Sequence, residues 1–168
     1  MKMIAAVDEK WGIGKDGGLL FSIPEDMKFF RAQTQGKTVI MGYKTLLSLP
    51  GSKPLKNRQN IVLSRKPELT IEGATVVHSV NELLALVSDR ESPIDPDDVM
   101  IIGGASIYNA FLPFCSEALI TKISADGNAD TFIQNLDLLE NWSVSDCSEK
   151  KEHEGLVYQF VTYKNSLV

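Results

Sequence analysis

The chain has 168 residues and a formal net charge of −5. A chain of this length buries about two thirds of its unfolded surface without cross-links, so a single domain is the simplest expectation. The acidic balance provides no general attraction to nucleic acid or to anionic membranes, and neither is an expected partner.

Cysteine usage and the N-terminal segment indicate the compartment. Cys115 and Cys147 are far apart and form no C-x-x-C motif, so neither a disulfide framework nor a metal site is expected. The apolar run Met3–Val7 stops at Asp8, which makes it too short for the core of a signal peptide, and no stretch approaches the length of a membrane span. We therefore expect a cytoplasmic protein, and a monomer.

Hydrophobic patterning predicts strands and helices that alternate. The expected strands are Met3–Val7, Thr38–Met41, Asn60–Leu63, Ala74–Val77, Val99–Ile102, Ala118–Ile123, Trp142–Cys147 and Leu156–Tyr163. The expected helices are Pro24–Gln33, Tyr43–Leu49, Val80–Arg90 and Ser106–Leu112. This alternation predicts an α/β fold with substantial parallel pairing. The last two strands are separated by a charged turn at 149–154, which predicts an antiparallel hairpin at the edge of the sheet.

The start of the first helix has a local signature. Ser22 and Glu25 have the spacing of a capping box, in which each side chain bonds the backbone of the other residue. Pro24 is tolerated in a first turn, where its missing N–H is not needed. A helix is therefore expected to begin here.

Asp26 is the unusual residue of this helix. Residues three and four positions apart share a helix face, so Asp26 should lie on the stripe that carries Ile23, Phe29 and Phe30. Burial against aromatic rings disfavours the charged carboxylate and raises its pKa. Such a group can act as an acid or bind a cationic or amidine-like ligand. The alternative is that Asp26 stays hydrated and only complements the helix N-terminus.

A glycine-rich segment follows the first strand. Residues 12–17 match G-x-G-x-x-G, but a dinucleotide fingerprint should open a helix and be followed by an acid about 20 residues on. Residues 18–21 continue as a loop, and Lys37 stands at the position of the acid. We interpret the segment as a mobile loop over a cleft.

Three later strand ends indicate a dinucleotide site. Residues 41–45 and 102–106 both run from strand through glycine into helix, and the N–H groups at such helix starts attract phosphate. The alternative is that the glycines only permit tight turns. Residues 63–66, together with Lys44, add a hydroxyl and positive charge, which would suit the 2′-phosphate of NADPH. The alternative for these cations is simple exposure to solvent.

Taken in order, these segments resemble the dihydrofolate reductase family over nearly the whole chain. The matching pieces are Ile4–Ala6, Gly12–Gly14, Ile23–Phe30, Thr38–Thr45, Pro54–Arg58, Asn60–Arg65, Val99–Tyr108 and Ala129–Phe132. The resemblance implies one domain over residues 1–168, with an eight-stranded, mostly parallel sheet, an antiparallel C-terminal strand and four flanking helices.

The resemblance implies the substrate site. Asp26 would be the acid that binds the 2-amino group and N3 side of the pterin ring, supported by Thr121 through a hydrogen-bonded network. Arg58 would pair with the α-carboxylate of the substrate's glutamate. Phe21 stands where many members have a tryptophan, and it can pack in the site but cannot donate a hydrogen bond. The implied wall residues are Ile4, Ala5, Met27, Phe30, Leu49, Leu55 and Ile102.

NADPH is the implied cofactor, held along the strand ends. The nicotinamide end would contact Ala6, Ile13 and Gly14. The pyrophosphate would contact Gly42, Lys44, Thr45, Gly103, Gly104, Ala105 and Ser106. The adenosine 2′-phosphate would contact Ser64 and Arg65, and further contacts would come from Leu63, Ile102, Ile107, Tyr108 and Thr131.

The implied reaction is NADPH-dependent reduction of 7,8-dihydrofolate to 5,6,7,8-tetrahydrofolate, with hydride delivered to C6 and a proton to N5. Antifolates are the implied class of inhibitor. Two alternatives stay open at the level of sequence. One is the related pyrimidine reductase of riboflavin synthesis, which lacks this helix acid. The other is a non-catalytic module that binds a nucleotide or a folate.

Overall fold

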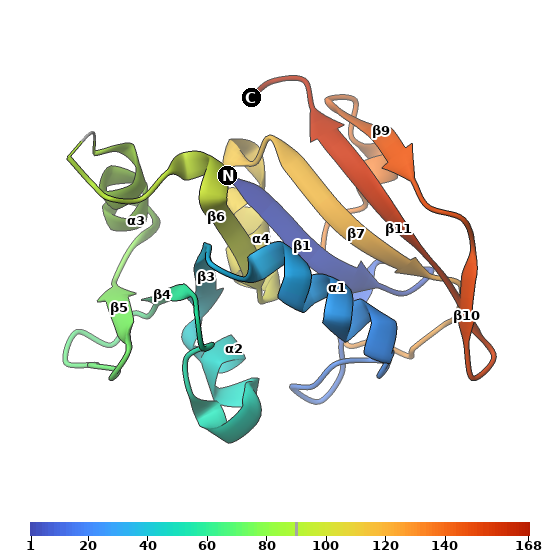
Figure 1. Cartoon of the computed structure of the whole chain (residues 1–168), viewed down its shortest axis with the longest axis horizontal. Coiled ribbons are helices and arrows are strands. Elements are labelled where there is room, and N and C mark those ends of the chain that lie inside the picture. The colour runs from blue at the N-terminus through green and yellow to red at the C-terminus, as the bar shows by residue number, and fades with distance from the viewer. Residues whose placement is uncertain (90) are drawn as a thin grey trace.

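The computed structural model describes every residue except Arg90, so the predicted end of the third helix at Arg90 lies outside the described residues. The strands of the main sheet are β1 (Lys2–Val7), β3 (Thr38–Gly42), β4 (Gln59–Leu63), β5 (Ala74–Val77), β6 (Val99–Gly103), β7 (Glu117–Ile123), β9 (Trp142–Cys147), β10 (Lys151–His153) and β11 (Leu156–Asn165). Their order is β10-β11-β7-β1-β6-β3-β4-β5, with β9 also paired to β11 (Figure 1).

Pairing directions agree with the predicted class. The six strands from β5 across to β7 run parallel, whereas β11 runs antiparallel to both β7 and β9. The predicted C-terminal hairpin is confirmed, with one addition: part of the charged turn forms β10, which also pairs with β11.

The helices lie on the two faces of this sheet. They are α1 (Pro24–Thr34), α2 (Tyr43–Ser48), α3 (Val80–Ser88) and α4 (Ala105–Phe111), and single 3-10 turns occur at η1 (Pro50–Ser52), η2 (Pro96–Asp98), η3 (Leu112–Phe114) and η4 (Leu136–Leu138). Figure 1 shows α1 crossing the front face and α4 lying behind the sheet. Within the described residues, no helix has the length and apolar character needed to cross a membrane.

The predicted capping box at the start of α1 is wrong. α1 begins at Pro24, and the apolar Ile23 occupies the N-cap position. The Glu25 carboxylate does not return to Ser22, because it accepts a hydrogen bond from the Tyr158 hydroxyl on β11 and lies 3.4 Å from Nζ of Lys151. Contacts with the sheet have replaced the local motif.

The glycine-rich segment is more ordered than predicted. Gly12–Gly14 forms strand β2, which pairs antiparallel with β8 (Thr131–Phe132) in a small second sheet. Because the segment forms a strand and opens no helix, the rejection of the dinucleotide fingerprint is confirmed. A three-residue strand carries too little periodicity to be seen without its partner.

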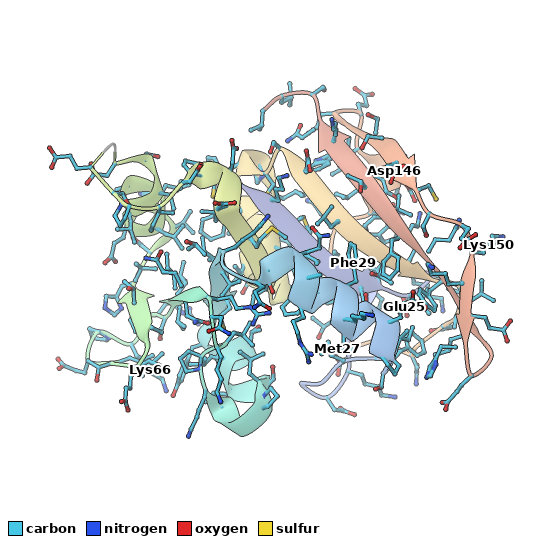
Figure 2. The ribbon with its side chains drawn as sticks, in the orientation of Figure 1. Glu25, Met27, Phe29, Lys66, Asp146 and Lys150 are labelled. Atoms are coloured by element: carbon cyan, nitrogen blue, oxygen red, sulfur yellow. The ribbon has the colours of Figure 1, made fainter. Side chains whose placement is uncertain are left out.

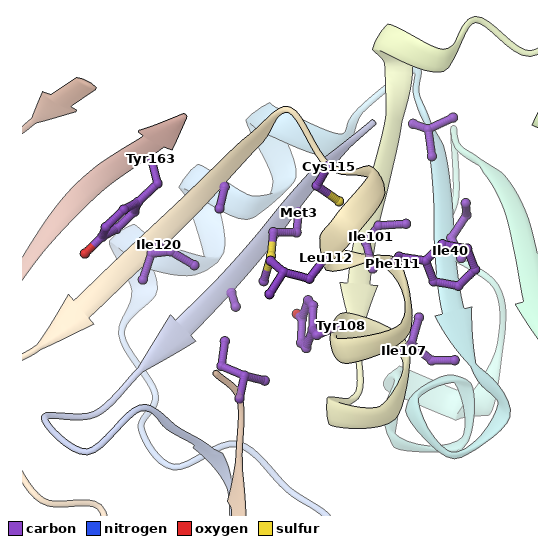
Figure 3. Close-up of a cluster of buried hydrophobic side chains, with 14 of the residues drawn as sticks. Met3, Ile40, Ile101, Ile107, Tyr108, Phe111, Leu112, Cys115, Ile120 and Tyr163 are labelled. Atoms are coloured by element: carbon purple, nitrogen blue, oxygen red, sulfur yellow. The ribbon is translucent and has the colours of Figure 1, made fainter. Parts of the chain in front are cut away.

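Alternation along the central strands builds two apolar layers. Met3 and Ile101 belong to the larger cluster, which packs against α4, whereas the neighbouring Ile4 and Ile102 belong to the cluster beneath α1 (Figure 3). Successive strand residues point to opposite faces, so one continuous apolar run serves both layers. Each fully buried aliphatic side chain contributes about 1.5–3 kcal/mol.

Candidate active site

The first turn of α1 places Asp26 against the sheet. Its Oδ1 accepts a hydrogen bond of 2.6 Å from Oγ1 of Thr121, which lies on β7 and is 1% exposed. Strand register sets Thr121 beside Ala6 at the end of β1. Partial burial raises the pKa of the Asp26 carboxyl, and the hydrogen bond from Thr121 opposes that rise. The structure therefore has the half-buried acid and excludes a fully hydrated Asp26.

The raised pKa predicts that Asp26 costs the free protein stability at neutral pH. A carboxyl with a raised folded-state pKa contributes stability that is fully present below the unfolded pKa and is lost as pH rises through the folded pKa. Asparagine cannot ionise and can still accept from Thr121, so Asp26→Asn should unfold about 2–4 °C higher at neutral pH, on the order of 1 kcal/mol. Calorimetry should show this gain shrinking as the pH is lowered toward about 4, whereas a gain independent of pH would contradict the argument.

Most predicted wall residues meet in one cluster beneath α1. Its predicted members are Ile4, Ile102, Phe30, Leu49 and Leu55. Met27 is 47% exposed and points from α1 toward the side where α2 lies (Figure 2). Ala5 packs in the cluster on the opposite face, because it alternates with Ile4 along β1. These residues thus form an apolar wall, and Asp26 lies at one end of it.

Arg58 lies just before β4, at the C-terminal end of α1. Its Nε and Nη2 donate to Oγ1 of the buried Thr34 at 3.2 and 3.0 Å, and its Nη1 donates to the carbonyl of Lys56 at 2.7 Å. Partial burial and the neighbouring charge of Arg31 lower the pKa of Arg58. These neutral acceptors orient the guanidinium without neutralising it, which suits recognition of a carboxylate.

The three predicted strand ends lie side by side. β3 pairs with β6 on one side and β4 on the other, with Met41 opposite Gly103 and Gly42 opposite Leu63. Carboxyl ends of neighbouring parallel strands form the crevice in which α/β proteins bind ligands. Their adjacency was expected from sequence only in part, because strand order was not predicted.

Glycine is required where the backbone of these ends comes close to other groups. Gly103 has φ +116°, and a Cβ there would lie 3.0 Å from the Tyr108 ring. A Cβ on Gly104 would lie 3.4 Å from Oγ1 of Thr45, which is close to an ordinary van der Waals contact, so the strict requirement for glycine applies to Gly103. Ala105 and the exposed Ser106 then begin α4. The glycine cradle at the start of α4 carries backbone N–H groups of the kind that bind phosphate.

Positive charge gathers beside the cradle. Lys44 and Arg65 are exposed, and the Oγ of Ser64 accepts from the Lys66 backbone N–H at 3.2 Å. Nζ of Lys66 lies 5.0 Å from the centre of the Tyr43 ring. Because Gly42 at the end of β3 lies opposite Leu63 at the end of β4, the cations of the predicted basic cluster, Lys44 and those of residues 63–66, follow neighbouring strand ends.

The opposite end of the site is closed by the loop before α1. A small apolar depression there is lined by Ala6, Val7, Asp8, Ile13, Leu19, Leu20, Phe21 and Ile123. Gly14 lies opposite Thr131 across the β2–β8 pair. Three predicted residues, Ala6, Ile13 and Phe21, thus share this depression.

Ile107 and Tyr108 are buried in α4, and their side chains face the protein interior. The Tyr108 hydroxyl donates to the carbonyl of Ile4 at 2.6 Å, and Ile107 packs where a Cβ on Gly42 would lie. Both residues therefore brace the backbone of the site. This hydrogen bond was not predicted from sequence, because its partners are 104 positions apart.

Asp8 is a site-supporting residue that sequence reasoning missed. It is 2% exposed, and its carboxylate accepts from the backbone N–H groups of Lys10, Gly12 and Gly127. A Cβ on Gly127 would lie 2.8 Å from Leu20, so this loop packs closely under the loop that closes the site. The available signal was an acid directly after a buried strand.

The fold and this arrangement are those expected of an NADP-dependent oxidoreductase, and the comparisons with known proteins agree. A family model described as dihydrofolate reductase matches residues 1–165. The dihydrofolate reductase of Neisseria gonorrhoeae is 37% identical over 162 residues, covering 96% of this chain and 95% of that protein. The Bacillus subtilis enzyme is 34% identical over 170 residues, covering 99% and 96%.

A solved structure gives the same result. Dihydrofolate reductase from Enterococcus faecalis, complexed with NADP(H) and RAB-propyl, aligns with a TM-score of 0.84 and 32% identity, covering 98% of this chain and 95% of that one. The chain therefore belongs to the dihydrofolate reductase family and is an NADPH-dependent oxidoreductase. These matches favour this family over the pyrimidine reductase of riboflavin synthesis and over a non-catalytic module.

Proposed function

We propose that Asp26 is the acid of the pterin site in this enzyme, which reduces 7,8-dihydrofolate to 5,6,7,8-tetrahydrofolate with NADPH as reductant. The observation that carries the proposal is the Asp26–Thr121 pair, a half-buried carboxyl held at 2.6 Å by a buried hydroxyl at the end of an apolar wall. An acid in this setting matches the amino-pyrimidine edge of a pterin in hydrogen-bonding capacity and charge.

The protein's part of the reaction is to bind, orient and exclude water. NADPH, when bound, supplies the hydride that reduces C6. Asp26 binds the 2-amino group and N3 side of the ring, and Thr121 fixes the direction of its carboxyl. The negative charge of Asp26 favours protonation at N5, and a water carries the proton because Asp26 lies at the other end of the ring. Ile4, Phe30 and Ile102 exclude bulk solvent, which strengthens these interactions.

The remaining roles are proposed from the family resemblance, together with the positions of these residues in the fold. Arg58 takes the α-carboxylate of the glutamate, and Leu49 and Leu55 flank the benzoyl group. Phe21 covers the pterin without donating a hydrogen bond. Ala6, Ile13 and Gly14 hold the nicotinamide end, and the glycine cradle with Lys44, Thr45 and Ser106 holds the pyrophosphate. Ser64 and Arg65 take the 2′-phosphate.

Cofactor preference tests the basic cluster. Arg65→Ala should raise the KM for NADPH about tenfold, because one charge-assisted contact with a phosphate is lost. NADH carries no 2′-phosphate, so its KM should change little. Initial rates with both cofactors give the comparison, and Lys150→Ala, which removes an exposed cation near β10, is the matched control. Equal rises of the KM values for NADPH and NADH would show that Arg65 does not bind the 2′-phosphate.

The reaction itself is tested by the loss of NADPH absorbance on adding dihydrofolate to the purified full-length chain. Rapid oxidation is expected with dihydrofolate, and only slow oxidation with the pyrimidine substrate of riboflavin synthesis. Tight NADPH binding without turnover of dihydrofolate would overturn the proposal.

We further propose that the chain acts as a single-domain monomer in the cytoplasm and that antifolates bind its pterin pocket. Light scattering should give a mass near 18.5 kDa, and unfolding should follow one cooperative transition. An antifolate with a diaminopyrimidine ring should compete with dihydrofolate and bind Asp26→Asn more weakly. A mass twice as large would contradict the proposed monomer. Non-competitive inhibition would contradict antifolate binding in the pterin pocket.

A further inference from the structure

Two successive acids attach the first turn of α1 to the sheet. Asp26 accepts from Thr121 on β7, and Glu25 accepts from the Tyr158 hydroxyl on β11 at 2.5 Å. β7 and β11 are neighbouring antiparallel strands, and Tyr158 lies opposite Ile123 in their register, two positions along β7 from Thr121. The helix start is therefore tied to two adjacent strands, one acid to each.

The hydrogen bond between Glu25 and Tyr158 should be stable near neutral pH. Tyr158 is 1% exposed, and burial together with Glu25 raises the pKa of its hydroxyl to about 12, so the hydroxyl remains a donor near neutral pH. The hydrogen bond from Tyr158 lowers the pKa of Glu25, which keeps the acceptor ionised. Lys151 of β10 adds a cation 3.4 Å from the second oxygen of Glu25.

Aromatic packing also attaches α1 to β11. The Tyr158 ring meets Phe160 edge-on, with centroids 5.7 Å apart, and Phe160 stacks on Phe29 of α1 at 4.3 Å. Figure 2 shows Glu25 at the end of α1 nearest β10 and Phe29 facing the strands. Because the N-cap position carries the apolar Ile23, the helix start depends on these contacts with β11.

We propose that Glu25 and Tyr158 are positioning residues for dihydrofolate reduction, whose hydrogen bond determines where the adjacent Asp26 carboxyl meets the pterin. The inference rests on the proposed role of Asp26. A shift of the first turn would move Asp26 relative to both Thr121 and the substrate, and small misplacements of a binding group weaken productive binding strongly. Neither Glu25 nor Tyr158 need touch the substrate for this effect.

The test compares variants of the full-length chain by their KM values for the two ligands. Tyr158→Phe removes only the hydroxyl, and Glu25→Ala removes the acceptor together with its ion pair to Lys151. Each should raise the KM for dihydrofolate about tenfold, because a hydrogen bond to a charged group is lost, while the KM for NADPH stays within about twofold. The double variant should be no worse than Glu25→Ala alone, because Tyr158→Phe removes only a hydrogen bond that Glu25→Ala already lacks.

Matched variants separate positioning from general stability. Glu25→Gln keeps an acceptor for Tyr158 and should restore most of the dihydrofolate affinity. Glu149→Gln loses another carboxylate near Lys151, with a side chain that is 84% exposed, and should behave as wild type. In an Asp26→Asn background, Tyr158→Phe should have little further effect on the KM for dihydrofolate.

Two results would overturn the proposal. One is an equal rise of both KM values, and the other is a lower unfolding temperature with both KM values unchanged, since each indicates a purely structural role. Wild-type turnover of dihydrofolate, measured alongside, reports on the proposed function independently. A full tenfold effect of Tyr158→Phe in the Asp26→Asn background would also exclude action through Asp26.

Discussion

Asp26→Asn should lower kcat/KM for dihydrofolate by about 10²–10⁴-fold at neutral pH, the range that a positioned acid contributes. The variant keeps the shape of the side chain and an acceptor for Thr121 but loses the charge that favours protonation at N5. The KM for NADPH should change little, because the proposed cofactor site lies along the strand ends. Since the same variant is expected to be more stable than wild type, its lost activity cannot be attributed to unfolding.

The pH dependence gives the sharper measurement. Because the negative charge of Asp26 favours protonation of N5, the wild-type rate of hydride transfer should fall as pH rises through the titration that the acid and the bound substrate share. Asp26→Asn should lack that inflection. Single-turnover rates over about pH 5–9 separate this chemical step from product release. The exposed acid Asp146 on β9 provides a control variant, Asp146→Asn. An unchanged pH profile in Asp26→Asn would refute the role of Asp26.

Arg58→Leu should raise the KM for dihydrofolate about 10²-fold, because two charge-assisted hydrogen bonds to the α-carboxylate are lost together. The turnover number should change far less, since the glutamate lies remote from the reacting bond. Arg58→Lys should recover only part of the loss, because lysine keeps the charge but cannot present two parallel donors. Initial rates are measured as a function of dihydrofolate concentration for wild type, Arg58→Leu and Arg58→Lys. They give the KM and the turnover number of each protein.

A shortened substrate separates recognition from scaffolding. Arg58 also donates to Thr34 and Lys56, so its removal could disturb the end of α1 directly. A dihydropterin that lacks the glutamate has no α-carboxylate for Arg58 to bind. Wild type and Arg58→Leu should therefore reduce it with nearly equal kcat/KM. A 10²-fold difference with the shortened substrate would show that Arg58 acts only by holding α1.

Local patterns predicted the elements that carry their own signal. Continuous apolar runs marked β1, β3, β4 and β6 because both faces of those strands are buried. Asp26 stood out because a carboxylate on an apolar stripe is rarely tolerated without a partner. The dinucleotide site was predicted because two strand ends have glycine directly before a helix, whereas one such glycine alone is explained by a tight turn.

The capping box shows where local reasoning failed. Ser22 and Glu25 had the right spacing, but Tyr158, 133 residues away, takes the Glu25 carboxylate. A local hydrogen bond worth about 1 kcal/mol is easily displaced by a buried donor that would otherwise be unsatisfied. The same reason explains why the Tyr108–Ile4 and Asp8–Gly127 hydrogen bonds were missed, since each joins segments that are distant in sequence.

The amino-acid sequence by itself determined the α/β class, the order of the main strands and helices along the chain, the acid on α1 and the glycines at the ends of β3 and β6. Each of these depends on residue type and short-range spacing. Only the tertiary structure decided that β3, β4 and β6 lie side by side, that Thr121 meets Asp26 and that Tyr158 takes Glu25. These contacts join residues up to 133 positions apart. They form only when folding places β7 and β11 beneath α1, because hydrogen bonds act over about 3 Å and carry no signature along the chain.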